Sequence, residues 1–298
     1  MKRAMRSCAA LAVVLLVLAL ASAAAGCSSK VTFSDGTGRS VTLKGIPKRI
    51  ISLSPACTET LFALGAGDKI VGVDSYSYWP VEAQQKEKVG DAFNLNLEKI
   101  VSLKPDLIIL AGSKGAPPSQ LKDMDRLGIP AYVSAASTVK EVLADIERLA
   151  GVIGAQKQGK ELVAKIQKDL DQVAASIPKD ASKRPKVLFL VDADLWTVGP
   201  ASFVGDIVAT AGGRNVVEDP KQEYLQISME QVLAADPDVI LLAIPEGQEK
   251  ALVARPGWSE LRAVREGKVY FVNGDLTSRP GPSVAEGVKE VAKHLFTE

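Results

Sequence analysis

The chain has very little histidine: only one occurs among its 298 residues. That residue, His294, falls in a predicted helix close to the end of the chain, where we expect it to be solvated or half packed. Without a second histidine, a three-histidine zinc or manganese site is excluded, and so is a histidine-dependent catalytic triad. The chain also lacks a Gly-x-x-x-x-Gly-Lys-Ser/Thr loop, so it does not bind ATP through one. We therefore expect no catalytic residue, no metal site and no cofactor.

Cysteine is scarce as well, with three residues in the whole chain. Cys8 lies in an N-terminal apolar segment and Cys27 ends that segment, so Cys57 is left without an intrachain disulfide partner. We expect Cys57 to be a buried, small apolar side chain in a helix.

An excess of charge of either sign is also missing. Without residues 1–26, the chain has two more acidic than basic side chains. A near-neutral protein lacks the basic surface that nucleic acid requires, so we expect no nucleic-acid partner.

What the chain does have is a long apolar run at its start. The opening letters MKRAMRSCAALAVVLLVLALASAAAGC place a basic head before apolar residues 8–26, which is the pattern of an export signal. Its end resembles a bacterial lipobox, in which the cysteine, here Cys27, is lipidated and becomes the new N-terminus. A leucine is usual where Ala24 stands, and the run is long enough for an uncleaved membrane anchor. Both interpretations place the rest of the chain outside the cytoplasm and tethered to a membrane.

The remaining sequence alternates strand and helix. VTFSDGTGRSVTL predicts a small β-hairpin, RIISLSP a strand, and ACTETLFALGAG a helix that begins after Ser54 with Pro55 at its first position. Further strands and helices follow in turn, which predicts parallel strands with helices on the faces of the sheet.

The pattern from Val139 to Ile177 is helical throughout, with breaks that predict two helices. The second, from about 156 to 177, would be about 30 Å long and could cross between two domains. After it, the strand and helix alternation restarts. The sequence therefore predicts a signal peptide at 1–26, a tether and hairpin at 27–46, an N-terminal α/β lobe at 47–154, a connecting helix at 155–178 and a C-terminal α/β lobe at 179–298.

One phrase occurs twice. NLNLEKIVSLKPDLIILA (94–111) aligns with QISMEQVLAADPDVILLA (226–243), which places Glu98 over Glu230 and a Pro-Asp corner over another. The repeat indicates matching elements of two similar lobes. Ligands bind sheets of this kind at the carboxyl ends of the strands, so we expect a cleft between the lobes.

Aromatic and polar residues concentrate in loops that follow predicted strands. Together they suit a large, partly planar, amphipathic ligand held by stacking and a few polar contacts. Two of them, Asp275 and Arg279, could instead pair with each other. The full set is Tyr76, Tyr78 and Trp79 in DSYSYWP, Trp196, Tyr224, and Asp275 and Arg279 in GDLTSRPGP.

Nearly all of the mature chain, from PKRIISLSPACTETLFALGAGDKIVGVDSYSYWP to GDLTSRPGPSVAEGV, resembles a known family. It is similar to the substrate-binding proteins of ABC importers for cobalamin, ferric siderophores and haem. The resemblance implies an α/β fold of two similar Rossmann-like lobes joined by one long α-helix, with small hinge adjustments instead of wide closure. The Ser-Leu-Ser-Pro, Ser-Tyr-Ser-x-x-Pro and Asp…Arg-Pro-Gly-Pro segments are most similar to the cobalamin-binding branch.

The resemblance also implies ligand contacts. In that branch a tyrosine of the Ser-Tyr-Ser loop, an aromatic residue before the second-lobe glutamate and the Asp/Arg pair contact the corrinoid. Where the best-known member carries tryptophans, this chain has Ala92 beside Phe93, and Ala111, which leaves a siderophore or another corrinoid open. The expected ligand-binding residues are Tyr76, Tyr78, Trp79, Phe93, Trp196, Tyr224, Asp275 and Arg279.

In the same family, one glutamate on each lobe pairs with arginines of the membrane permease. By motif these residues are Glu98 and Glu230. A carboxylate near a helix start is locally favourable, and two such groups form a charge-guided, two-point contact. Plain helix capping is the alternative.

These observations predict a monomeric, extracytoplasmic lipoprotein on the cell membrane, on its periplasmic face if the host has two membranes. It would capture cobalamin, as transported ligand and not as cofactor, and deliver it to the permease and ATPase subunits of an ABC importer. One alternative is a ferric siderophore or haem as ligand. Another is a hydrolase built on Ser52, Ser54 and Asp275, against which the missing cleft histidine argues.

Overall fold

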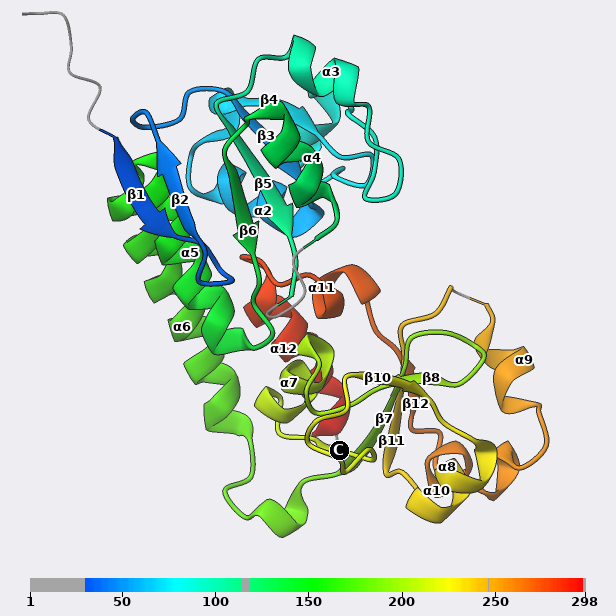
Figure 1. Cartoon of the computed structure of the whole chain (residues 1–298). Coiled ribbons are helices and arrows are strands. Elements are labelled where there is room, and N and C mark those ends of the chain that lie inside the picture. The colour runs from blue at the N-terminus through cyan, green and yellow to red at the C-terminus, as the bar shows by residue number, and fades with distance from the viewer. Residues whose placement is uncertain (1–29, 114–117, 246, 297–298) are drawn as a thin grey trace, which may run out of the picture.

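The computed structural model describes residues 30–113, 118–245 and 247–296 and shows two α/β lobes joined by a long helix (Figure 1). The predicted signal peptide and Cys27 lie outside these residues. None of the helices within the described ranges combines the length and apolarity that a membrane span requires.

The N-terminal lobe is built on a fully parallel sheet with strand order β4-β3-β5-β6. Its strands are short runs of almost wholly buried residues, as expected for a parallel sheet covered on both faces. The strands are β3 (Ile50–Leu53), β4 (Ile70–Val73), β5 (Leu107–Ala111) and β6 (Ala131–Ser134).

Helices cover this sheet much as the sequence predicts. The VEAQQKE segment forms a short 3₁₀ turn, η2 (Val81–Gln85). The other helical elements are α2 (Pro55–Ala63), η1 (Gly67–Lys69), α3 (Leu97–Ser102), α4 (Gln120–Leu127) and α5 (Val139–Ile153). A hairpin of β1 (Val31–Ser34) and β2 (Ser40–Leu43) lies beside the lobe (Figure 1).

The C-terminal lobe has a mixed sheet with order β10-β8-β7-β11-β12, in which β9 also pairs with β7. Strands β7 (Lys186–Leu190), β11 (Val239–Leu242), β12 (Val269–Phe271) and β9 (Arg214–Asn215) are parallel, whereas β8 (Trp196–Val198) and β10 (Tyr224–Gln226) are antiparallel. The antiparallel pair differs from the expected parallel arrangement. Its three-residue strands are too short to show a sequence period.

The helical elements of this lobe include several short turns. They are η3 (Ala181–Lys183), α7 (Phe203–Thr210), α8 (Met229–Ala235), α9 (Glu249–Val253), η4 (Trp258–Glu260), α10 (Arg262–Arg265), α11 (Gly274–Ser278) and α12 (Val284–Leu295).

The connecting helix α6 (Gln156–Ser176) follows α5 after Gly154, whose φ of 76° ends α5 in the left-handed region that glycine favours. Its buried face includes Ile166, Leu170 and Val173. These side chains belong to one hydrophobic core that continues from strands of the N-terminal lobe through α5 and α6 to strands of the C-terminal lobe. A core shared in this way favours small hinge motions over wide separation of the lobes. The expected fold of two similar α/β lobes joined by one long helix is confirmed.

Candidate functional site

The two copies of the repeated phrase perform the same structural task. Asp106 accepts hydrogen bonds from the backbone amides of Lys48 (2.8 Å) and Arg49 (3.0 Å), just before β3. Asp238 accepts one from the amide of Lys186 (2.7 Å), at the start of β7. In both lobes the aspartate of the Pro-Asp corner therefore fixes one strand to the beginning of its neighbour.

The glutamate of each copy has an equivalent position. Glu98 and Glu230 are the second residues of α3 and α8, and both are exposed. Neither forms an ion pair with a cation in the described residues. In Figure 1, α3 and α8 both lie to the right, away from α6 on the left.

Other side chains cap these two helices. Asn96 accepts from the amide of Lys99 at 2.9 Å, and Ser228 forms a capping box with Gln231. The pKa of Glu230 is lowered because its own backbone amide and the Ser228 side chain hydrogen-bond to the carboxylate, which keeps it ionised. The Glu230 carboxylate therefore takes part in capping α8, as the capping alternative expects.

Three of the predicted ligand residues meet at the boundary between the lobes. The Tyr78 hydroxyl donates to the carboxylate of Asp275. Arg279 Nη2 donates to the Tyr78 oxygen and to Asp275 Oδ1, both at 2.7 Å, and the guanidinium carbon lies 4.9 Å from the centroid of the tyrosine ring. The hydrogen bond to Asp275 is the main cause that raises the pKa of Tyr78. We call these three residues the cross-lobe cluster.

Both sides of the cross-lobe cluster are anchored. On the C-terminal side, Asn273 Oδ1 accepts from the amide of Asp275 at 2.9 Å and so begins α11, which lies between the lobes in Figure 1. On the N-terminal side, buried Asp74 accepts from the Ser77 hydroxyl, and Thr58 bonds to the same hydroxyl at 2.8 Å. This buried network holds the loop that carries Tyr78. The sequence interpretation did not identify it, although Asp74 and Ser77 stand within DSYSYWP.

The serines of the hydrolase alternative are part of the same network. Ser52 is fully buried and bonds to Thr58 at 2.8 Å and to the carbonyl of Ser54 at 3.2 Å. Asp275 is engaged by Tyr78 and Arg279. Ser52 therefore has a structural role, with no hydroxyl presented to a substrate.

The structure does not gather the remaining predicted ligand residues into the cross-lobe cluster. Trp196 and Tyr224 lie at diagonal positions on β8 and β10, with side chains on one face of this strand pair. Tyr76 is exposed in the DSYSYWP loop, and Phe93, at 92% exposure, is the most solvent-accessible large apolar side chain in the described ranges. Trp79 instead lines a separate groove of about 760 Å³ beside α2.

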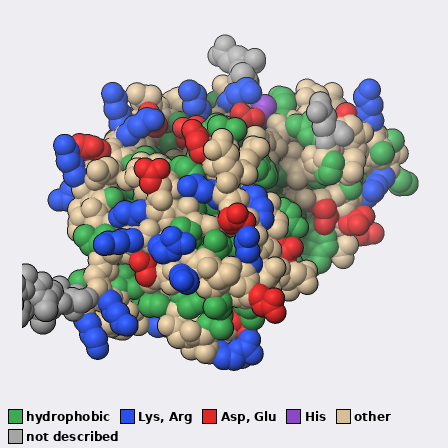
Figure 2. All heavy atoms as spheres, turned by 90° about the horizontal axis from the view of Figure 1, so that it is seen from above, with side chains coloured by type: hydrophobic (Ala, Val, Ile, Leu, Met, Phe, Trp, Pro, Cys, Tyr) green, Lys and Arg blue, Asp and Glu red, His purple; other side chains and the backbone are tan. Residues whose placement is uncertain are grey.

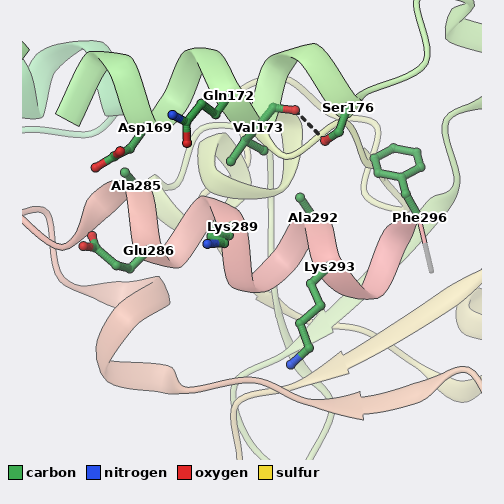
Figure 3. Close-up of a pocket in the computed structure, with 10 residues that line it drawn as sticks. All are labelled: Asp169, Gln172, Val173, Ser176, Ala285, Glu286, Lys289, Ala292, Lys293 and Phe296. Atoms are coloured by element: carbon green, nitrogen blue, oxygen red, sulfur yellow. Dashed lines mark hydrogen bonds between the residues drawn. The ribbon is translucent and has the colours of Figure 1, made fainter. Parts of the chain in front are cut away.

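A further hollow of about 520 Å³ separates α6 from α12 (Figure 3). Its floor is apolar, with Val173, Ala285 and Ala292, and exposed Lys289 stands between the two helices. No predicted ligand residue lines it. It is therefore distinct from the expected ligand site.

Cys57 and His294, which belong to the two scarce residue types, have structural roles. Cys57 is buried in α2, which confirms the expected buried side chain in a helix, and burial raises the pKa of its thiol to about 12. His294 stacks on Tyr270 with ring centroids 4.6 Å apart and is half packed in α12. Within the described ranges, no group of three His, Cys, Asp or Glu side chains could hold a metal ion.

A second contact across the lobe boundary involves Glu59, which the sequence interpretation did not identify. The Ser283 hydroxyl, at the start of α12, donates to the carboxylate of Glu59 in α2. Burial raises the pKa of Glu59, although the Ser283 hydrogen bond and the charge of Arg279 act in the opposite direction. This contact joins the last helix of the chain to the N-terminal lobe.

The raised pKa of Glu59 predicts a pH-dependent stability. A carboxyl group whose pKa is higher in the folded state favours folding at low pH and loses that contribution as the pH rises through the folded-state pKa. We expect the Glu59→Gln variant to gain thermal stability relative to wild type as the pH rises from acid to neutral, measured by circular dichroism. Exposed Glu82→Gln is the control, and a Glu59→Gln difference that is constant with pH would contradict the assignment.

Two curated proteins are similar to this chain over most of its length. The chain is 36% identical over 274 residues to the uncharacterized ABC transporter substrate-binding lipoprotein YvrC of Bacillus subtilis, which covers 90% of this chain and 86% of that protein. It is 33% identical over 254 residues to the vitamin B12-binding protein of Vibrio cholerae, which covers 83% of this chain and 89% of that protein.

Two solved structures match this chain in fold and sequence. The crystal structure of the Vibrio cholerae vitamin B12-binding protein BtuF matches with a TM-score of 0.70 at 32% identity, over 84% of this chain and 96% of that one. A possible iron-binding protein from Staphylococcus epidermidis matches with a TM-score of 0.73 at 31% identity, over 84% and 99%. Residues 50–276 also match the family described as periplasmic binding protein. The chain therefore belongs to the periplasmic binding protein family and is a substrate-binding protein of the ABC-importer class in which one long helix joins two lobes.

Proposed function

We propose that the chain is a lipid-anchored receptor that captures a corrinoid of the cobalamin type between its lobes and delivers it to an ABC permease, without catalysing a reaction. The observation that carries this proposal is the cross-lobe cluster. Asp275 and Arg279 neutralise each other 2.7 Å apart and are bridged by the Tyr78 hydroxyl, which donates to one and accepts from the other. A ligand group that replaces this hydroxyl needs a donor and an acceptor together.

Primary amides have this chemistry, and amide side chains surround the corrin ring of cobalamin. An amide can accept from Arg279 and donate to Asp275 at once. A carboxylate, such as a haem propionate, would bring its charge close to that of Asp275. The cluster therefore favours a corrinoid over haem.

Exposed aromatic rings on both lobes support a large flat ligand. Tyr76 and Phe93 come from the N-terminal lobe, and Trp196 and Tyr224 from the C-terminal lobe. Rings of this kind bury large apolar areas and stack on planar groups. The vitamin B12-binding protein of Vibrio cholerae supports the same choice, because it is similar to this chain over most of its length.

A ferric siderophore is the second candidate. The Staphylococcus epidermidis structure is described as a possible iron-binding protein and matches this chain as well as the vitamin B12-binding protein does. The small residues Ala92 and Ala111 also leave the aromatic lining incomplete for a corrinoid.

The proposal predicts saturable, one-to-one binding of cyanocobalamin. Purified protein mixed with cyanocobalamin and then desalted should remain red, and calorimetric titration should give a single binding isotherm. The same titrations are repeated with hydroxocobalamin, haemin and a ferric hydroxamate siderophore. If the desalted protein is colourless and the siderophore binds, the ligand is a ferric siderophore and not a corrinoid.

A further inference from the structure

The tether of the proposed lipid anchor is very short, and the inference below rests on that anchor. Only residues 28–30 separate Cys27 from the first strand, which begins at Val31. Four Cα-to-Cα steps span at most about 14 Å. A lobe of this size is about 35 Å across. Lipid attached to Cys27 would therefore hold the start of β1 close to the bilayer surface.

The hairpin that begins there is firmly attached to its lobe. In its turn, buried Asp35 accepts from the amide and hydroxyl of Thr37 (3.0 and 2.7 Å), and the amide of Gly36 donates to the carbonyl of Val133 in β6 at 2.8 Å. Val41 and Leu43 of β2 are buried in the lobe. A constraint on β1 is thus a constraint on the orientation of the whole N-terminal lobe.

The open end of the hairpin has the chemistry of a membrane-contact surface. Val31 pairs with Leu43, so the antiparallel register brings Lys30 beside Lys44. Lys48 is exposed a few residues later, as are Lys30 and Lys44. Asp106, which accepts from the backbone amides of Lys48 and Arg49, places one carboxylate beside these lysines.

Apolar side chains accompany these lysines. Val31 is 48% exposed and Ile46 is 59% exposed, although Ile46 also packs beside Gly154 at the start of the α5–α6 junction. Figure 2 looks onto this end of the N-terminal lobe and shows Lys and Arg side chains spread over it, with fewer Asp and Glu between them. Exposed apolar residues ringed by lysine suit the boundary between lipid headgroups and acyl chains.

We propose that Lys30, Val31, Lys44, Ile46 and Lys48 form a membrane-contact face that rests on anionic phospholipid headgroups. Each lysine held near an anionic bilayer strengthens the attraction by about fivefold. In Figure 1, α8, which carries Glu230, belongs to the C-terminal lobe and lies on the other side of the molecule from the hairpin, so this orientation keeps α8 away from the bilayer contact.

The test uses the lipidated full-length protein, purified from membranes and reconstituted into vesicles. Ile46→Cys carries a fluorophore on the contact face, and Gln248→Cys carries it on the C-terminal lobe as a reference. Buried Cys57 does not compete for the label. We expect headgroup nitroxide lipids to quench the label at 46 severalfold more than the label at 248, in vesicles that contain phosphatidylglycerol.

Charge variants test whether the three lysines cause this difference in quenching. The Lys30→Glu, Lys44→Glu, Lys48→Glu triple variant should lose this difference, as should wild type in phosphatidylcholine vesicles or high salt. A matched triple variant of exposed lysines elsewhere, Lys168→Glu, Lys179→Glu, Lys183→Glu, should keep it. Equal quenching at 46 and 248, or mass spectrometry that finds no lipid on Cys27, would overturn the membrane-contact face. Cyanocobalamin binding by the same samples tests the proposed function separately.

Discussion

A chain with Glu98→Ala and Glu230→Ala is expected to bind its corrinoid normally and to support no uptake. Both carboxylates are exposed, lie at equivalent positions in the two lobes and are without an ion-pair partner in the described residues. Charge pairs across protein interfaces are coupled by about 1.5–7 kcal/mol. Removing both glutamates should therefore weaken docking on the permease by more than about a hundredfold, while the ligand Kd changes by less than about twofold.

The measurement is corrinoid uptake in cells that lack another binding protein for it, together with calorimetry on the purified variant. Glu147→Ala with Glu161→Ala is a matched control, because it removes two exposed glutamates from α5 and α6, on the opposite side of the molecule. Helix stability is a minor factor, since a carboxylate in the first turn contributes about 0.3–1 kcal/mol. Uptake that survives the double substitution would remove Glu98 and Glu230 from the docking surface.

The features that the sequence predicts correctly are those written in local patterns. Alternating apolar strands and amphipathic helices predict the two lobes, and the repeated phrase predicts their equivalence. The Pro-Asp corner is the clearest case. Asp106 and Asp238 stand at the same place in each copy because both bind backbone amides of a neighbouring strand.

What the sequence does not predict depends on contacts between distant residues. Tyr78 and Asp275 are 197 positions apart, and Glu59 and Ser283 are 224 apart, so no periodicity links them. The neighbours Tyr78 and Trp79 look alike as exposed aromatic residues, yet one joins the cross-lobe cluster and the other lines a separate groove. Side-chain direction in a loop is set by tertiary contacts, such as the buried Asp74 network, and not by residue type.

The Tyr78 hydroxyl occupies the hydrogen-bonding positions of Asp275 and Arg279 that we assign to a ligand amide. Ligand binding must then displace this hydroxyl, so Tyr78 has two roles with opposite effects. Its ring can support the ligand, whereas its hydroxyl competes with it. Arg279 only favours ligand binding, since its guanidinium can donate to an acceptor of the ligand in place of the Tyr78 oxygen.

Substitutions that separate these roles should change affinity in opposite directions. Arg279→Ala is expected to raise the corrinoid Kd about ten- to a hundredfold, because a hydrogen bond to a charged group contributes about 1.5–3 kcal/mol and Asp275 loses its partner. Tyr78→Phe keeps the ring and removes the competing hydroxyl, so we expect its Kd to fall severalfold. Tyr76→Phe, in the same loop, is the control and should leave the Kd unchanged. Calorimetry that finds weaker binding for Tyr78→Phe would show that the hydroxyl contacts the ligand directly and does not compete with it.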